Sequence, residues 1–301
     1  MWGAVRCSNA PMRGVGWPDG HKGAFALTFD VDAESAILAM GPAYAGRLST
    51  MSHQAYGPKV GVPRILELLE RHRLRATFFI PGLTADRYPG MVEKIAAAGH
   101  EIGHHGYSHV PFHSLSEDRE RHELERGLAS LERITGTRPR GFRAPWWELN
   151  ERTPALLSEY GFDFDSSLMD DDRPYLLDTG RGLLAELPVH WMLDDWEQYA
   201  FLPEPNIGSV IESPAKALEL WRLELDALVD DQGLFILTCH PFISGRPSRV
   251  RALEQLIEHG RARGDVWFAS LSEIAAHVHA NLPASQARPL SLVRIEEGVY
   301  V

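Results

Sequence analysis

The sequence predicts an α/β protein in which parallel strands alternate with helices, as they do in a (β/α) barrel. About seven short apolar runs are each followed by a helical pattern, and parallel strands need such crossover connections. The 301 residues suit one large domain of this kind. Neither G-x-G-x-x-G nor G-x-x-x-x-G-K-[ST] follows the first strand, so a doubly wound open sheet is the weaker alternative.

The first half of the chain predicts three strand–helix pairs. The expected strands are residues 24–29, 75–80 and 100–103, which are rich in aromatic and β-branched residues or lie between turn signals. The expected helices are residues 62–72, 88–98 and 116–135, where apolar residues recur at helical spacing among charges. Pro63 suits a helix start and Gly99 a helix end, and Ser116, or Ser114 with Glu117, suits the start of the third helix.

The second half continues the alternation. The run LFILT at 234–238 is typical of a strand buried on both faces, and 214–230 has the pattern of a long amphipathic helix. The other expected strands are residues 141–143, 161–164, 183–189 and 265–269, and the other expected helices are residues 153–160, 248–263 and 272–280. Residues 41–61 mix Gly, Pro, Ser and Tyr, so we expect a long ordered loop there.

Charge and cysteine content limit the partners and the compartment. Thirty Lys and Arg against 41 Asp and Glu give a net charge of −11, which opposes binding to nucleic acid. The two cysteines, Cys7 and Cys239, form no CxxC pair, so neither a disulfide framework nor a zinc ribbon is expected. No apolar run resembles a signal peptide or reaches the ~18–20 residues of a membrane span. We therefore expect a cytoplasmic protein with no membrane partner.

Acidic residues follow the first expected strand. Asp30, Asp32 and Glu34 alternate along extended chain, so we expect them to share one face. Three carboxylates on one face repel each other unless a cation or an arginine lies among them. The cluster therefore suits a metal ligand beside a general base, although a solvated strand end is an equally simple interpretation.

Six of the 14 histidines crowd into one stretch: His100, His104, His105, His109, His113 and His122. Histidines four residues apart can hold a divalent cation, with a carboxylate completing a three-ligand open site. Three overlapping pairs have this spacing, namely 100/104, 105/109 and 109/113, so the spacing alone does not choose among them. Surface or capping histidines are the common alternative.

Two further clusters follow later strands. Arg143 suits a tether for a carboxylate, while Trp146 and Trp147 offer flat walls on which a small ring stacks, unless both are core residues. His240 at the end of 234–238 is placed as a general acid or a metal ligand. Cys239 beside it is expected to point into the core.

Taken in order, five segments resemble the successive motifs of the polysaccharide deacetylase family, the NodB-type carbohydrate esterases. They are TFDVDAE, HEIGHHGYSH, GFRAPWW, FDFDSSL and LTCHPF. The resemblance implies the distorted (β/α) barrel of that family, with a catalytic domain at 21–280, an N-terminal extension at 1–20 and a C-terminal extension at 281–301.

The resemblance also implies roles for individual residues. Asp32, His105 and His109 match the family's ligands for one divalent ion, which we expect to be zinc, with cobalt, nickel or manganese as alternatives. Asp30 matches the general base and His240 the general acid. Arg143 matches the tether of the base, Trp146 lies in the motif that lines the pocket, and Asp165 lies in a motif that supports the acid or the arginine. We also expect Trp147 and Tyr107 to contact substrate, and Glu34 to be a supporting residue whose role the resemblance does not define.

The first motif departs from the common family pattern of two adjacent aspartates. Asp-Val-Asp-Ala-Glu resembles an intracellular branch with peptidoglycan-deacetylase-like proteins, allantoinases and cyclic imide hydrolases. The sequence thus predicts a metal-dependent hydrolase of non-peptide C–N bonds, most concretely an N-deacetylase of an acetylated amino sugar or of a polysaccharide- or peptidoglycan-type substrate. The expected partner is a small-molecule or oligosaccharide amide. Ring opening of a cyclic amide or imide is the alternative, followed by a non-catalytic metal-binding module. We also expect a homo-oligomer.

Overall fold

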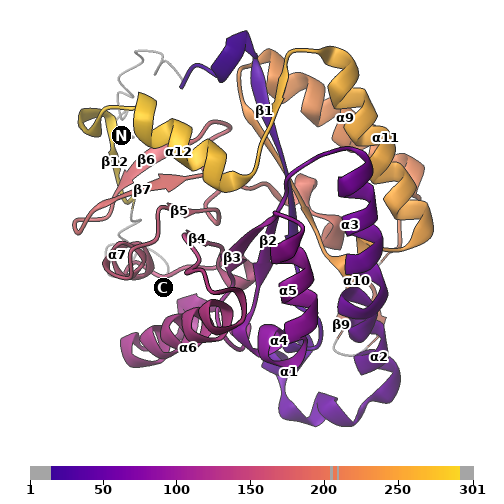
Figure 1. Ribbon diagram of the computed structural model, residues 1–301. Helices are drawn as coiled ribbons and strands as arrows, with labels where there is room; N and C mark the ends of the chain where they lie inside the picture. The colour runs from indigo at the N-terminus through magenta and orange to yellow at the C-terminus, as the bar shows by residue number, and fades with distance from the viewer. Residues whose placement is uncertain (1–14, 204–205, 209, 292–301) are drawn as a thin grey trace, which may run out of the picture.

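The computed structural model describes residues 15–203, 206–208 and 210–291, and it confirms an α/β fold with a mostly parallel sheet (Figure 1). Seven described strands are parallel neighbours along this sheet. In order they are β10 (Leu234–Cys239), β1 (Gly23–Asp30), β2 (Thr77–Ile80), β3 (Glu101–His104), β4 (Gly141–Phe142), β5 (Phe164–Asp165) and β7 (Leu183–Glu186).

Three further strands complete the sheet. β11 (Val266–Phe268) pairs with the first residues of β1, and β12 (Arg288–Pro289) pairs with β6 (Tyr175–Asp178). β6 runs antiparallel to β7, a hairpin that the sequence analysis did not predict. Among the described strands, the order ends at β10 on one side and at β12 on the other, so hydrogen bonds do not close the sheet into a ring.

The central strand β1 is buried along its whole length, and its two faces meet different layers. Phe25, Leu27 and Phe29 face a core shared with the outer helices, where Trp221 is almost fully buried. Ala24 and Ala26 face the other side, which the C-terminal helix covers. This alternation follows from the two-residue period of a strand.

Twelve helices surround the sheet in the described part of the chain (Figure 1). The longer ones are α3 (Val62–Arg71), α5 (Pro89–Ala97), α6 (Glu117–Thr135), α7 (Thr153–Glu159), α9 (Pro214–Asp230), α11 (Pro247–Arg263) and α12 (Leu271–Asn281). Near the carboxyl ends of the strands lie α1 (Ser35–Met40), α2 (Leu48–Tyr56), α4 (Gly82–Arg87), α8 (Asp195–Tyr199) and α10 (Pro241–Ser244).

The helix ends test three sequence signals. Gly99 follows α5 with a φ of +81°, as expected for a residue that ends a helix. Ser116 is the residue before α6, but its side chain makes no capping hydrogen bond, so the proposed capping pattern is not formed there. A complete capping box instead begins α12, where Ser270 and Glu273 satisfy each other's backbone N–H groups.

The expected loop at residues 41–61 is wrong, because this segment is helical. It contains a 3₁₀ turn at Pro42–Gly46, the helix α2 and a π-helical turn at Gly57–Gly61 that runs directly into α3. The prolines at 42 and 58 both occupy the first turn of a helical element, where the missing N–H costs nothing. Gly57 and Gly61 pack closely on α10, which immediately follows His240.

The described parts of both predicted extensions pack on the domain. Val15 and Trp17 are buried in the same core as α12, and Trp17 lies with its ring centre 6.0 Å from that of Trp267. Near the other end, β12 adds a strand beside β6. Residues 1–14, with Cys7, and residues 292–301 lie outside the described residues, and the division into domain and extensions stays a prediction. None of the described helices has the length and hydrophobicity that a membrane crossing requires.

The close approach of Gly61 to α10 gives a first prediction. A Cβ atom added at Gly61 would collide with the carbonyl oxygen of Pro241, a backbone atom that cannot move aside cheaply. Gly61→Ala should therefore lower the free energy of unfolding by about 1–3 kcal/mol, the usual cost of overpacking. Urea denaturation followed by circular dichroism measures this change.

Gly90→Ala is the matched control, because nothing lies within 4 Å of a Cβ atom there and the residue belongs to α5. This variant should be as stable as the wild type or about 0.5 kcal/mol more stable. Equal urea midpoints for the wild type and Gly61→Ala would contradict the predicted backbone collision.

Candidate active site

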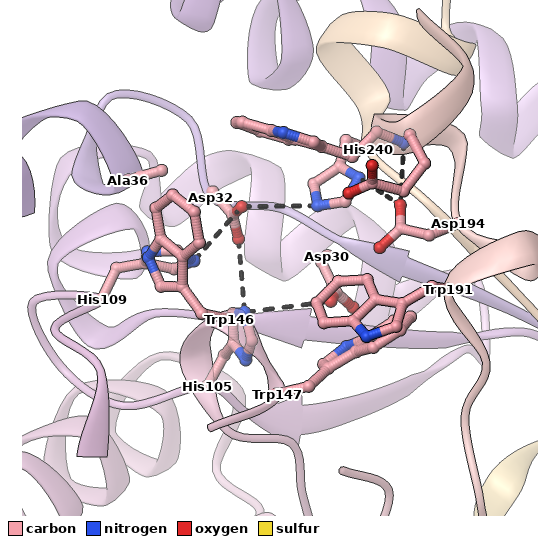
Figure 2. A pocket seen from close by; sticks show the side chains of 12 residues that line it. Asp30, Asp32, Ala36, His105, His109, Trp146, Trp147, Trp191, Asp194 and His240 are labelled. Atoms are coloured by element: carbon pink, nitrogen blue, oxygen red, sulfur yellow. Dashed lines mark hydrogen bonds and ion pairs between the residues drawn. The ribbon is translucent and has the colours of Figure 1, made fainter. Parts of the chain in front are cut away.

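The carboxyl ends of four strands on one side of the sheet bring the predicted site residues together. Asp30 ends β1, His105 follows β3, Arg143 follows β4 and His240 follows β10. A pocket of about 240 Å³ opens at this edge of the sheet (Figure 2). It is lined by Asp30, Asp32, Ala36, His105, His109, Trp146, Trp147, Trp191, Asp194, Trp196, Glu197 and His240. Functional groups at the carboxyl ends of parallel strands are the rule in barrel enzymes.

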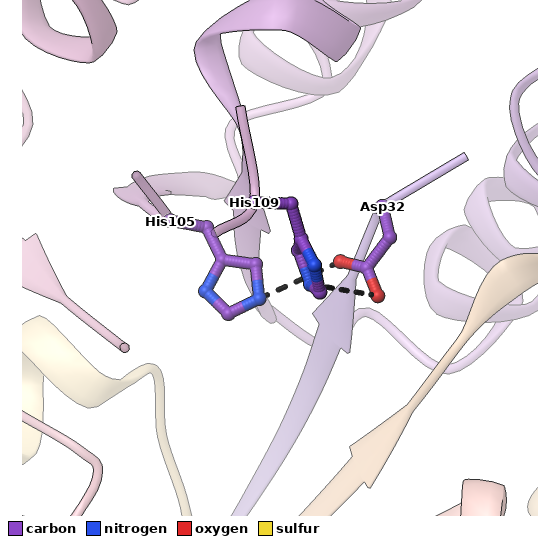
Figure 3. A group of neighbouring side chains, drawn as sticks. All are labelled: Asp32, His105 and His109. Carbon is purple, nitrogen blue, oxygen red and sulfur yellow. Dashed lines mark ion pairs between the residues drawn. The ribbon is translucent and has the colours of Figure 1, made fainter. Parts of the chain in front are cut away.

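Asp32, His105 and His109 converge on one point of this pocket (Figure 3). The Nε2 atom of His105 lies 3.5 Å from Oδ1 of Asp32, and Nε2 of His109 lies 3.3 Å from Oδ2 of Asp32. His105 donates its Nδ1–H to the carbonyl oxygen of Arg143 at 2.7 Å, which leaves the lone pair of Nε2 facing Asp32. All three side chains are buried.

These three residues fit a divalent metal ion. Zinc ligands at ~2.0–2.1 Å and tetrahedral angles lie about 3.3–3.4 Å apart, close to the 3.3 and 3.5 Å that separate the imidazole nitrogens from the carboxylate oxygens of Asp32. The Oδ1 atom of Asp32 is buried and has no hydrogen-bond partner among the described residues, as expected for an atom reserved for a cation. Burial lowers the pKa of His105, which keeps its imidazole neutral and able to bind metal.

The carboxylate of Asp30 is held by a buried arginine. Arg143 donates from Nη1 to Oδ1 of Asp30 at 2.8 Å and to the hydroxyl of Thr28 at 2.9 Å. Its Nε and Nη2 atoms donate to the carbonyl and hydroxyl oxygens of Ser166 at 3.1 and 3.0 Å. The guanidinium is fully buried and lies 4.3 Å from the ring centre of Phe79. Asp30 is therefore fixed in orientation, with its other oxygen 3.9 Å from Nε2 of His105.

His240 lies across the pocket from Asp30 and is held by two acids that the sequence analysis missed. Its Nδ1 lies 2.7 Å from Asp195 and 3.5 Å from Asp194, and its Nε2 lies 3.6 Å from Asp32. The backbone N–H of His240 and the hydroxyl of Ser244 also donate to Asp195. Burial lowers the pKa of His240, but Asp194, Asp195 and Asp32 together raise it to about 10.

Four tryptophans form the walls of the pocket. The ring centres of Trp146 and Trp196 lie 6.3 Å apart, and Trp196 contacts the ring of His240 at 5.1 Å. On the other side the rings of Trp147 and Trp191 pack against each other with centres 4.5 Å apart and planes tilted by 30° (Figure 2). Trp191 and Trp196 were not predicted. Their only sequence signal is a cluster of aromatic and acidic residues after the strand at 183–189, outside the five motifs.

The backbone around the pocket is strained. Four residues have a positive φ, between +50° and +63°, which residues other than glycine rarely adopt. They are Ala33, His109, Trp146 and Trp147. Each such residue costs on the order of 1–3 kcal/mol and persists only where its surroundings enforce it. Three of the four line the pocket, so the strain is concentrated at the candidate site.

Glu34 does not share a face with Asp30 and Asp32, which corrects that expectation. The positive φ of Ala33 turns the chain, and Glu34 becomes the residue before α1. Its carboxylate accepts a hydrogen bond from Tyr88 at 2.7 Å and pairs with Arg87 at 3.2 Å, outside the pocket lining.

Tyr107 also lies outside the pocket lining, although we predicted a substrate contact there. Its ring packs on Gly82 of α4, and Arg126 of α6 lies 3.7 Å from the ring centre. Its hydroxyl accepts a hydrogen bond from Arg126 and donates one to Asp86. The segment after β3 sends His105 and His109 into the pocket and Tyr107 away from it.

Asp165 lies beside the segment that binds Arg143. Its Oδ1 accepts a hydrogen bond from Ser167 at 2.7 Å, and the Ser167 hydroxyl accepts from the backbone N–H of Ala144 at 2.9 Å. Glu186 on β7 accepts from the backbone N–H groups of Ser167 and Leu168. Both carboxyl groups are fully buried beside the segment that binds Arg143.

The other crowded histidines have structural surroundings. His104 is fully buried between the carbonyl of Leu124 and the N–H of Gly106, and burial lowers its pKa to about 3. His100 contacts the ring of Phe78. His113 and His122 are exposed, and none of the four lines the pocket. Cys239 is buried in the core, as expected.

Comparison with known proteins agrees with this fold. The family model for polysaccharide deacetylase matches residues 54–164. The chain is 31% identical to the peptidoglycan deacetylase of Helicobacter pylori over 278 residues, which cover 83% of this chain and 94% of that protein.

Solved structures extend the comparison. A Mycobacterium smegmatis protein assigned to the polysaccharide deacetylases is 53% identical, with a TM-score of 0.90 over 94% of this chain and 98% of that one. The Puue allantoinase is 25% identical, with a TM-score of 0.78 over 91% of this chain and 95% of that one.

A mostly parallel sheet that gathers acidic and imidazole groups at its carboxyl edge, together with these neighbours, defines an enzyme of the NodB barrel type. The chain belongs to the polysaccharide deacetylase family, whose members are hydrolases that act on carbon–nitrogen bonds other than peptide bonds.

The buried carboxyl pair behind Arg143 predicts a pH dependence of stability. Burial raises the pKa of Asp165 from 3.8 to about 6, and burial together with Asp165 raises the pKa of Glu186 well above its usual value. The folded protein thus keeps a proton that the unfolded chain releases near pH 4. The contribution of this proton to stability is full below that pH and should fall by about 3 kcal/mol as the pH rises through 6.

Asp165→Asn should flatten this decline, because the amide cannot ionise. The measurement is the urea midpoint between pH 4 and pH 8, with Asp118→Asn, an exposed change on α6, as the control that keeps the wild-type slope. Equal slopes in Asp165→Asn and the wild type would show that the pair holds no proton.

Proposed function

We propose that this protein hydrolyses an amide C–N bond with the help of a divalent ion, most concretely as an N-deacetylase of an acetylated amino sugar. One observation carries the proposal. The Asp32–His105–His109 group lies in a single pocket between a tethered carboxylate, Asp30, and a carboxylate-supported imidazole, His240. A base, a three-ligand site and an acid are the groups that addition of water to an amide requires.

A divalent ion held by Asp32, His105 and His109 would act as a Lewis acid toward the amide carbonyl and would make water easier to deprotonate. Asp30 is the base that accepts the proton from the attacking water. Arg143 keeps this carboxylate in place, because four of its hydrogen bonds and the packing on Phe79 prevent the guanidinium from moving.

His240 is the acid that gives a proton to the leaving nitrogen. With its pKa raised to about 10, the imidazole holds a proton at neutral pH. Asp195 receives the Nδ1–H, so the proton on Nε2 points toward the pocket. Cleavage of the C–N bond then yields acetate and a free amine.

Ring opening of a cyclic amide or imide is a second candidate. The pocket of about 240 Å³ has room for a small ring, and tryptophans bound it on several sides. The similarity to an allantoinase supports this alternative. A non-catalytic metal-binding module is less well supported, because base, tether and acid are all present around one pocket. A homo-oligomer, a cytoplasmic location and the lack of nucleic-acid and membrane partners stay predictions.

Metal content tests the ligand assignment. The wild-type protein, loaded with zinc and dialysed, should keep about one equivalent per chain by mass spectrometry of the metal, and cobalt, nickel and manganese should compete. Asp32→Ala and His109→Ala should each keep less than a tenth, because an open three-ligand site loses most of its affinity with one ligand. His122→Ala, an exposed change, is the control. Full occupancy in Asp32→Ala would refute the assignment.

A substrate panel tests the acid and separates the two candidate reactions. Acetylated chito-oligomers, allantoin and simple imides are assayed with the metal-loaded enzyme. On whichever substrate is turned over, His240→Asn should lower kcat about 100- to 10,000-fold with metal content unchanged, since the leaving nitrogen loses its proton donor. His113→Asn, an exposed histidine outside the pocket, should retain full activity. Retained kcat in His240→Asn would remove this residue from the mechanism.

A further inference from the structure

The pocket has an unusual set of polar groups beyond those with a proposed catalytic role. After the metal ligands, Asp30 and His240 are set aside, the described lining consists of Ala36, four tryptophans and two acids, Asp194 and Glu197. Apart from indole N–H groups, the exposed polar group of this remaining wall is an acceptor, the carboxylate of Glu197, because Asp194 is buried and already accepts from the N–H of Trp196. A neutral sugar carries hydroxyls that both donate and accept, so a wall of this kind suits a ligand that brings its own N–H donors.

The charges near the ligand also favour a cation. Asp30 is paired with Arg143 and Asp195 with His240, and the described pocket lining includes no lysine or arginine. Glu197 is exposed at the pocket and pairs with no cation among the described residues, so its charge is left to face the ligand.

The aromatic walls add to this preference. Trp146 is 37% exposed and its ring lies 6.3 Å from that of Trp196, so two indoles bound the space beside Glu197, the residue that follows Trp196. Indole faces attract ammonium groups, and tryptophan does so best among the aromatic side chains. Indoles together with a carboxylate and no competing lysine or arginine form a site that suits an alkylammonium group.

The position of this wall indicates which half of the substrate carries the charge. Trp196 contacts the ring of His240, and α8 supplies both Asp195, which supports His240, and the wall residues Trp196 and Glu197. His240 is the proposed donor to the leaving nitrogen, so the wall lies on the amine side of the amide. We propose that the pocket selects amides whose amine half carries a second, positively charged nitrogen, held between Trp146, Trp196 and Glu197.

This inference rests on the proposed amide hydrolysis and adds the substrate class. The test compares two nearly isosteric amides, N-acetyl-1,4-diaminobutane and N-pentylacetamide, which differ in a terminal ammonium against a methyl group. With the zinc-loaded enzyme, kcat/KM for the cationic amide should be at least about tenfold higher, the effect of one partly desolvated ammonium contact. The ratio should fall as salt is raised, because the mouth of the pocket is exposed.

Glu197→Gln should reduce the ratio of the two kcat/KM values to about threefold or less, mainly by raising KM for the cationic amide. Glu258→Gln, the same change at an exposed position of α11, should keep the wild-type ratio. A ratio near one in the wild type, or an equal loss for both amides in Glu197→Gln, would overturn the inference while leaving amide hydrolysis intact.

A binding measurement keeps the two proposals separate. Butylammonium should quench the tryptophan fluorescence of the wild type with an affinity at least about tenfold higher than 1-butanol, and Glu197→Gln should abolish this difference. If no amide is hydrolysed, the proposed function fails regardless of the quenching. If amides are hydrolysed but butylammonium binds no better than butanol, the cation preference fails alone.

Discussion

The rest of the site depends on one buried ion pair, that of Arg143 with Asp30. A guanidinium without solvent exposure is tolerable only when its donors are satisfied, and here they reach from β4 to Asp30 on β1 and to Ser166 after β5. The backbone carbonyl of the same arginine orients His105. A single residue therefore sets the direction of the proposed base and of one proposed metal ligand, and the strands between them cannot shift without breaking both contacts.

The cost of this arrangement falls on the backbone around it. His109, Trp146 and Trp147 hold positive φ angles, and the folded core must offset that strain. The offset comes from strands such as β1 and β10, which are buried along their length and paired in one continuous register. Burial of apolar side chains on both faces of these strands stabilises the fold and compensates for the strained backbone at their carboxyl ends.

The sequence predicted the repeating elements well, because strand and helix periods are local. The sequence analysis singled out Asp30, Asp32, His105, His109, Arg143 and His240 because they lie at the ends of such strands and because the motifs together resemble one family. The structure brings these six residues together at one edge of the sheet. The local sequence pattern did not predict the structure where contacts between distant segments determine it. Residues 41–61 look like a loop yet are helical against α10, Ala33 turns Glu34 away, and the acids that hold His240 precede it by some 45 residues.

Asp194 and Asp195, the acids that the sequence analysis missed, link the pKa of His240 to the proposed recognition of the ligand. α8 has only five residues, too few for a helix to persist alone, so it depends on its ends. Asp194 caps its N-terminus by accepting from the N–H of Trp196 at 2.8 Å, and Asp195 is bound to His240 and Ser244. The contacts that fix the imidazole are therefore the contacts that fix the wall formed by Trp196 and Glu197. Any rearrangement of α8 changes the proton donor and the amine-side wall together, whereas Asp32, His105 and His109 are held by other strands.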